Sequence, residues 1–175
     1  MIARATVLAS LVLAGCGGRA NERPPEVAHE TPEDEVLRVG TTWQAMQQSR
    51  GIRPPPNVIE RFERTVTSTL RLHSGSATAE EHVSVAEKLT IRSGERFDCT
   101  AESAFNVRVR YARHNGAAAV EVSRPPVVLS RRCSPGDFPE PTLEAGSAAA
   151  RFVLRSDQLV AYEPMGDERV YLPIE

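Results

Sequence analysis

The sequence has almost no lysine, few aromatic residues and no long hydrophobic run. Lys88 is the only lysine among 21 basic residues, and these are set against 23 acidic residues to give a net charge of −2. A dedicated nucleic-acid-binding protein usually carries a strong basic excess, so this balance argues against one. No apolar run reaches the roughly 18 residues that a membrane-spanning helix needs. The 175 residues suffice for one domain with a tail.

The common catalytic motifs are also missing. The sequence contains no Gly-x-Ser-x-Gly elbow, no glycine-rich phosphate loop and no Cys-x-x-Cys pair. His73 and His82 could meet across a predicted turn, but they would form only an incomplete metal site. We therefore expect no catalytic residue, no metal and no cofactor. A hydrolase that uses paired carboxylates stays open as the less favoured alternative, because the spacing of such a pair is spatial rather than sequential.

The first sixteen residues have the pattern of an export signal. Arg4 precedes an apolar stretch over residues 5–15, which is too short to span a bilayer. The stretch ends in Leu13-Ala14-Gly15-Cys16, which resembles the lipobox of bacterial lipoproteins. The resemblance implies cleavage after residue 15, a diacylglycerol thioether on Cys16 and an amide-linked acyl chain such as palmitate. More than one buried chain gives stable membrane anchoring.

The lipobox resemblance also implies a location. The protein is expected in the cell envelope, held by its lipid anchor. Because Gly17 rather than Asp follows the cysteine, the outer membrane is favoured in a host that has two membranes.

A polar tether is predicted between the anchor and the domain. Residues 16–34 are rich in Pro, Glu and Gly, and Val27 is their only sizeable apolar residue. Such a segment cannot bury enough surface to offset its ordering entropy, so we expect it to be disordered. The globular domain is then residues 35–175.

Hydrophobic alternation with a period of two dominates this domain. It runs through Val66 to Leu72, Val83 to Ile91 and Phe105 to Tyr111, and Asn115-Gly116 is a strong hairpin signal. We expect a mainly all-β fold, an antiparallel meander that forms a small barrel or a sandwich. A first strand is predicted over 35–39. One short helix is predicted over 41–50, with Thr41 or Thr42 as its cap and Gly51 after it.

The C-terminal stretch carries a second, weaker resemblance. Alternating residues from Phe152, a Ser156-Asp157 turn, a further alternating run and Gly166-Asp167 precede the last strand. This pattern, about 25 residues long, is similar to the closing strands of small lipocalin-like barrels in envelope lipoproteins. Gly40 and Trp43 stand one residue too far apart for the lipocalin Gly-x-Trp motif, so no ligand residues are carried over.

Two cysteines remain once Cys16 is assigned to the lipid. Export places Cys99 and Cys133 in an oxidising compartment, where a pair usually forms a disulfide. On the chain-entropy model a loop of this length contributes roughly 3–4 kcal/mol. Both cysteines lie at the ends of predicted strands, so we expect the bridge to hold the central hairpin together.

Charged side chains on the predicted strands suggest two further features. Glu87 keeps the inward phase of Val85 and Leu89, so it is either a buried carboxylate or is turned outward by a β-bulge near Ala86. We favour the bulge. Five arginines would form a basic surface for an anionic partner if their strands are neighbours, or a solvated face with Glu121 as counter-charge. They are Arg108, Arg110, Arg113, Arg131 and Arg132.

These features together favour a non-enzymatic envelope protein. It would act as a binding or accessory module, with a hydrophobic small molecule in the barrel or an envelope protein as its partner. The alternative is a structural or assembly subunit that docks a complex through a basic face or a sheet edge. The membrane is contacted through the lipid anchor, and no nucleic acid is expected.

Overall fold

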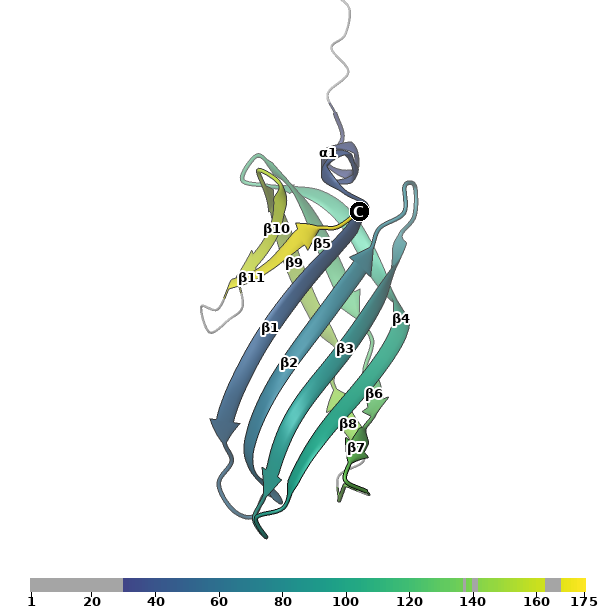
Figure 1. Ribbon diagram of the computed structural model, residues 1–175. Helices are drawn as coiled ribbons and strands as arrows, with labels where there is room; N and C mark the ends of the chain where they lie inside the picture. The colour runs from purple at the N-terminus through teal and green to yellow at the C-terminus, as the bar shows by residue number, and fades with distance from the viewer. Residues whose placement is uncertain (1–29, 137, 140–141, 163–167) are drawn as a thin grey trace, which may run out of the picture.

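An eight-stranded antiparallel barrel forms most of the protein (Figure 1). The computed structural model describes residues 30–136, 138–139, 142–162 and 168–175. The strands follow chain order around the ring, β1-β2-β3-β4-β5-β9-β10-β11, and pairing between β11 and β1 closes it. The prediction of an all-β antiparallel meander is confirmed, and the meander forms a barrel rather than a sandwich. The elements are α1 (Pro32–Val39), β1 (Thr42–Ile52), β2 (Ile59–Arg71), β3 (Thr78–Ile91), β4 (Arg96–His114), β5 (Ala117–Arg124), β6 (Val127–Ser130), β7 (Arg132–Ser134), β8 (Thr142–Ala145), β9 (Ala148–Arg155), β10 (Gln158–Tyr162) and β11 (Glu168–Pro173).

The barrel wall follows the hydrophobic alternation of the sequence. In β3 the residues from Ala79 to Ile91 alternate between the interior and solvent, so one side of the strand packs in the core. The predicted hairpin is present between β4 and β5, where Asn115 and Gly116 adopt φ values of 50° and 83°. Two consecutive left-handed residues are what a tight type I′ turn requires.

Two local predictions near the N-terminus are wrong. Residues 42–50 of the predicted helix 41–50 belong to strand β1, because they pair with β2 along their whole length and bury Trp43 and Ala45. Residues 35–39 belong to helix α1 rather than to a strand. Thr31 caps this helix and Pro32 begins it, and the Asp34 side chain completes a reciprocal capping box.

The predicted tether therefore ends earlier than expected. Residues 32–34 form the first turn of α1. The predicted signal segment 1–15 and residues 16–29 of the predicted tether lie outside the described residues. Within the described part of the chain, no helix has the length and apolar character needed to cross a bilayer.

Helix α1 lies at one end of the barrel and packs into it (Figure 1). Val36 is fully buried among the core residues. The Gly75 N–H in the β2–β3 turn donates to the Glu33 carboxylate over 2.6 Å. The Arg113 guanidinium, next to the β4–β5 turn, pairs with Glu35. The helix is thus joined to two different hairpins and plugs this end of the barrel.

The other end of the barrel is built differently. Strands β1 to β4 extend well beyond the shorter strands β5 and β9–β11 (Figure 1). In this lower half β7 pairs with β4, and β6 and β8 form a separate two-stranded sheet. Strand β1 pairs with β11 only through Trp43 and Gln44. The ring of strands is therefore complete only in its upper half.

We predict that Tyr111→Phe stabilises the protein. The Tyr111 hydroxyl is buried and has no hydrogen-bond partner among the described residues, and an unsatisfied buried hydroxyl costs about 1 kcal/mol or more. Burial, together with the Glu33 carboxylate, raises the pKa of Tyr111 to about 12. Urea unfolding at neutral pH should therefore show the variant to be more stable by about 1 kcal/mol.

The same substitution should change the response to alkali. Tyr111 ionises near pH 10 when unfolded but only near 12 when folded, so wild-type stability is lost as the pH rises through this interval. The variant should lose less stability there. When phenolate absorbance is followed in the ultraviolet as the pH is raised, the variant should lack the phenolate that forms near pH 12. Loss of a phenolate that forms near pH 10 instead would show that Tyr111 is not the shifted group.

Candidate functional site

A charged cluster lies inside the upper half of the barrel. The Arg124 guanidinium donates to both carboxylate oxygens of Glu81, over 2.6 Å and 3.0 Å. Ser68 donates to the same carboxylate over 2.5 Å, and the Tyr171 hydroxyl donates to Ser68 over 2.8 Å. Glu81, on β3, is only 1% exposed, and its partners come from β2, β5 and β11. Burial raises the pKa of Tyr171, which keeps its hydroxyl as a donor in this network.

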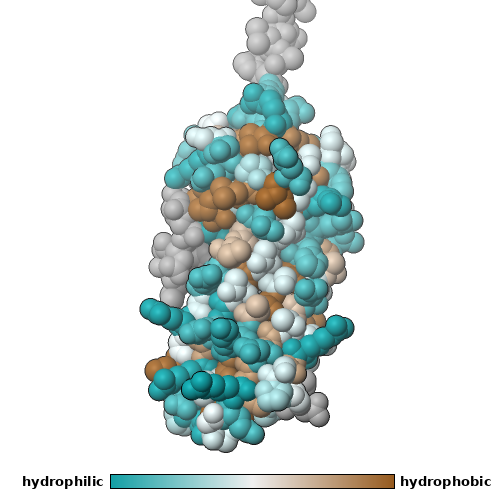
Figure 2. All heavy atoms as spheres, in the orientation of Figure 1, coloured by the Kyte–Doolittle hydropathy of each residue, from teal (hydrophilic) through white to brown (hydrophobic). Residues whose placement is uncertain are grey.

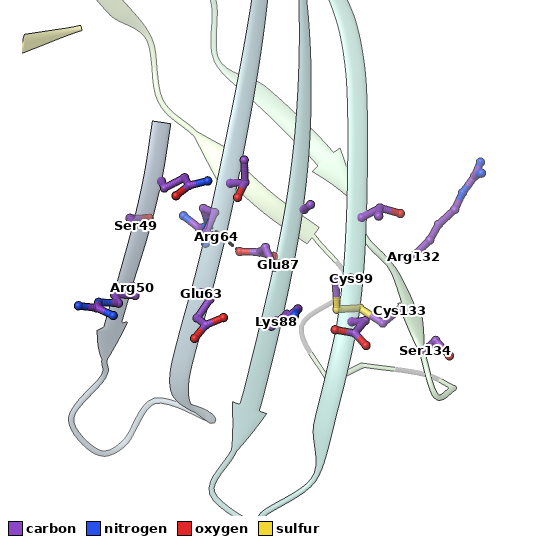
Figure 3. A pocket seen from close by; sticks show the side chains of 15 residues that line it. Ser49, Arg50, Glu63, Arg64, Glu87, Lys88, Cys99, Arg132, Cys133 and Ser134 are labelled. Carbon is purple, nitrogen blue, oxygen red and sulfur yellow. Dashed lines mark hydrogen bonds and ion pairs between the residues drawn. A yellow bond between two sulfur atoms is a disulfide. The ribbon is translucent and has the colours of Figure 1, made fainter. Parts of the chain in front are cut away.

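A second charged cluster lies inside the lower half. Arg64 of β2 donates to one oxygen of Glu87 over 2.6 Å (Figure 3). Arg131 donates to the other oxygen over 2.9 Å. Glu87 is 3% exposed, and the Arg131 side chain is nearly as buried. Both guanidinium groups also lie over aromatic rings, Arg64 over Phe62 and Arg131 over Phe138.

The predicted bulge that turns Glu87 outward is wrong. Strand β3 keeps an unbroken register with β2 and β4 through this region, with Glu87 opposite Arg64 on one side and Cys99 on the other. The regular alternation therefore directs the carboxylate inward. The partners that offset its desolvation come from β2 and from the residue before β7, which are far from it in sequence.

The predicted disulfide joins Cys99 of β4 to Cys133 of β7. The two cysteines face each other in the β4–β7 pairing, next to Glu87 in the same row (Figure 3). The bridge therefore holds the short strand β7 on the barrel wall rather than joining a central hairpin. It also places Arg131, two residues before Cys133, where its guanidinium reaches Glu87.

The five predicted surface arginines do not form one basic face. Arg131 points into the barrel, whereas Arg108, Arg110, Arg113 and Arg132 are exposed. Glu121 accepts from Arg110 and from Arg151 of β9, and these two contacts hold the pKa of Glu121 below its usual range. Arg113 pairs with Glu35 of α1. Most of this charge is therefore balanced locally, with Glu121 as the cross-strand counter-charge.

The sequence analysis missed three of the interior charged residues. Glu81 lies in the same inward phase of β3 as Val83 and Val85, and Arg64 lies in that of Val66 on β2. Extending each alternation by one or two residues would have placed both inside. Arg124, next to the Pro125-Pro126 break, shares the inward phase of Val120 and Val122.

A hollow of about 960 Å³ lies on the barrel wall in the lower half. Strands β1, β2, β3, β4 and β7 each contribute an inward-facing residue and its two neighbours, as Arg64 with Glu63 and Thr65 illustrates. The neighbours are mostly exposed and point away from the core, so the hollow is on the outer wall. Figure 2 shows mainly hydrophilic side chains over this lower part of the face.

Two rows of outward-facing side chains border this hollow. One row is small or uncharged apart from its last member, and the other alternates in charge. The first is Gln48, Thr65, Ala86, Thr100 and Arg132, and the second is Arg50, Glu63, Lys88, Asp98 and Ser134. The hollow therefore offers hydrogen-bonding groups and charges of both signs, which suits a polar partner more than an apolar one.

The interior clusters have the character of structural ion pairs. Both carboxylates are bound by guanidinium groups and are shielded from solvent, so a substrate could not contact them without the barrel opening. Within the described residues, no group of three or more His, Cys, Asp or Glu side chains is arranged to hold a metal ion. Comparison with known proteins found no matching family model, no similar curated protein and no similar solved structure.

We predict that Glu87→Gln is strongly destabilising. It removes the charge that Arg64 and Arg131 share and leaves them buried without it, a change that typically costs about 3–5 kcal/mol. The midpoint of urea unfolding measures this loss. Glu121→Gln is a matched control, because Glu121 also bridges two arginines but on the partly exposed outer surface.

The control should shift the unfolding midpoint far less, because water replaces the lost contacts of an exposed pair. Equal losses in the two variants would show that burial of the Glu87 cluster does not set its contribution to stability.

Proposed function

We propose that this protein is a lipid-anchored, non-enzymatic accessory module of the bacterial envelope that docks a protein partner on its barrel wall. The anchor follows from the lipobox resemblance at Leu13-Ala14-Gly15-Cys16 and the short apolar segment before it. The module is the plugged barrel that the described residues from Glu30 onward form. We favour docking of a protein partner over the binding of a hydrophobic ligand inside the barrel.

The observation that carries the docking role is the content of the barrel. A hydrophobic ligand needs an apolar interior space, as in barrels that hold small molecules. Here the interior contains Glu81 with Arg124 at one level and Glu87 with two arginines at another. A ligand entering there would separate these buried charges from their partners, which is costly. Helix α1 further occupies one end.

The outer wall supports the same proposal. Its hollow crosses five strands, a width of roughly 20 Å at the usual strand spacing. Threonine, glutamine and serine side chains along it supply donors and acceptors without requiring the barrel to change shape. A partner would therefore meet a preformed surface held by the disulfide and the Glu87 cluster.

The lipid anchor is tested on Cys16. Cells that express the chain and are fed an alkyne-tagged fatty acid should label the protein, and Cys16→Ser should abolish the label and release the protein from the membrane fraction. The Cys99–Cys133 pair provides a control, since substituting both should leave the label in place. Labelling that persists in Cys16→Ser would contradict the anchor.

The docking surface is tested by site-specific photo-crosslinking in the native host. A photoreactive residue at Thr100, in the hollow, should yield one discrete crosslinked protein. The same residue at Ser123, exposed on β5 outside the hollow, should not. Native mass spectrometry of the purified full chain provides the opposing outcome. A lipid-sized adduct released on denaturation, with no product from Thr100, would favour the ligand carrier instead.

A further inference from the structure

Strand β1 has a long edge without a neighbouring strand. It pairs with β2 from Thr42 to Ile52, but with β11 only at Trp43 and Gln44. Residues 45–52 therefore present one edge with which no described strand pairs, although the Arg169 side chain of β11 donates to the Gln47 side chain over 3.5 Å. The lower half of β1 lies at the open side of the sheet (Figure 1). At about 3.4 Å per residue this edge is roughly 27 Å long.

The alternation of the backbone identifies the groups that this edge offers. The Thr42 carbonyl accepts from Ile174 on the β11 side, whereas Thr41 and Arg53 bond toward β2. In an antiparallel ladder each residue directs its N–H and C=O to the same side. Even-numbered residues of β1 therefore face away from β2. The N–H and C=O groups of Met46, Gln48, Arg50 and Ile52 point to the open edge.

Apart from one charged side chain, Arg50, this edge lacks the features that usually block strand pairing. Residues 45–52 contain no proline and no lysine, and their register with β2 has no bulge. Two large apolar side chains lie on it, Met46 at 64% exposure and Ile52 at 72%. Regular, partly apolar edges of this kind recruit another strand.

We infer that the open edge of β1 pairs with β1 of a second copy of this chain, forming an antiparallel, two-fold symmetric dimer. With the two-fold axis at Ser49, Met46 lies opposite Ile52 of the second copy and Gln48 lies opposite its Arg50. The two exposed apolar side chains cover each other, and no like charges face across the junction. All four edge-facing residues are used, as an isologous interface requires.

The neighbouring registers are poorer. Moving the axis to Arg50 places the two Arg50 side chains directly opposite each other, where like charges repel. Moving it to Gln48 places Ile52 opposite Gln44, whose edge β11 already occupies. The sequence of the edge thus favours one register.

Pairing in this register would join the two outer hollows. The row that ends in Gln48 on one copy continues into the row that begins at Arg50 on the other. One continuous surface of about ten strands would then cross the dimer. The inference adds to the proposed docking surface but does not rest on the lipid anchor, because it concerns only described residues of the barrel.

Cysteine cross-linking tests both the dimer and its register. The full chain would carry Cys16→Ser, so that this residue neither anchors nor cross-links. Ser49→Cys places two thiols on the symmetry axis in a pair without backbone hydrogen bonds, where Cα atoms lie about 4.5 Å apart, within disulfide range. Gln47→Cys is the matched control, on the same side of β1. In this register the two thiols introduced at position 47 would be offset by four residues along the paired strands, a distance of about 13 Å, which is too far for a disulfide.

We expect Ser49→Cys to form a covalent dimer under mild oxidation at least ten times faster than Gln47→Cys. Sedimentation velocity over a concentration series should show the chain without added cysteines in a monomer–dimer equilibrium. Gln48→Glu, which places a carboxylate opposite Arg50, should tighten the dimer about two- to five-fold, and Gln48→Arg should weaken it by a similar factor. Circular dichroism confirms that each variant is folded.

Two results would overturn the inference. One is a chain that sediments as a monomer at every concentration. The other is cross-linking of Gln47→Cys as fast as that of Ser49→Cys, which would show association without this register.

Discussion

Burying a carboxylate inside a barrel requires a cation at the same depth, and that constraint organises the lower half of this protein. Glu87 is directed inward by the strict alternation of β3, so its partners must come from elsewhere. Arg64 comes from the adjacent strand, but Arg131 comes from a segment outside the closed ring. The ion pair therefore ties that segment to the wall. The adjacent disulfide fixes the same segment covalently, so each bond holds the other in register.

The parts of the fold that follow from local patterns could be read from the sequence. Alternating residues define the strands, and Asn115-Gly116 defines a hairpin because only left-handed residues make that turn. Residues 35–50 were harder, because β1 becomes a strand through pairing with β2 and not through its own propensity. Thr31 and Asp34 do carry a capping signal for α1, but the tether composition around them obscured it.

The interior clusters show why a candidate site was only partly predictable. The inward position of Glu87 follows from alternation alone. The burial of its charge is tolerated only because it pairs with Arg131, which is 44 residues away in sequence. Sequence spacing gives no measure of that distance in space, so a bulge was the reasonable expectation for an unpaired carboxylate. Glu81 and Arg124 form the same kind of pair in the upper half, 43 residues apart. Long-range charge pairing of this sort becomes visible only once the strand order is known.

Helix α1 stands between the barrel and everything that precedes residue 30, so it also determines how mechanical load enters the fold. Tension on the N-terminal segment would first act on the helix, not on the strands. It would be divided between the bond from Glu33 to the β2–β3 turn and the pair from Glu35 to Arg113 near the β4–β5 turn. Withdrawing Val36 from the core would require both to fail. Under tension the helix would thus detach from the barrel before the strands of the wall separate.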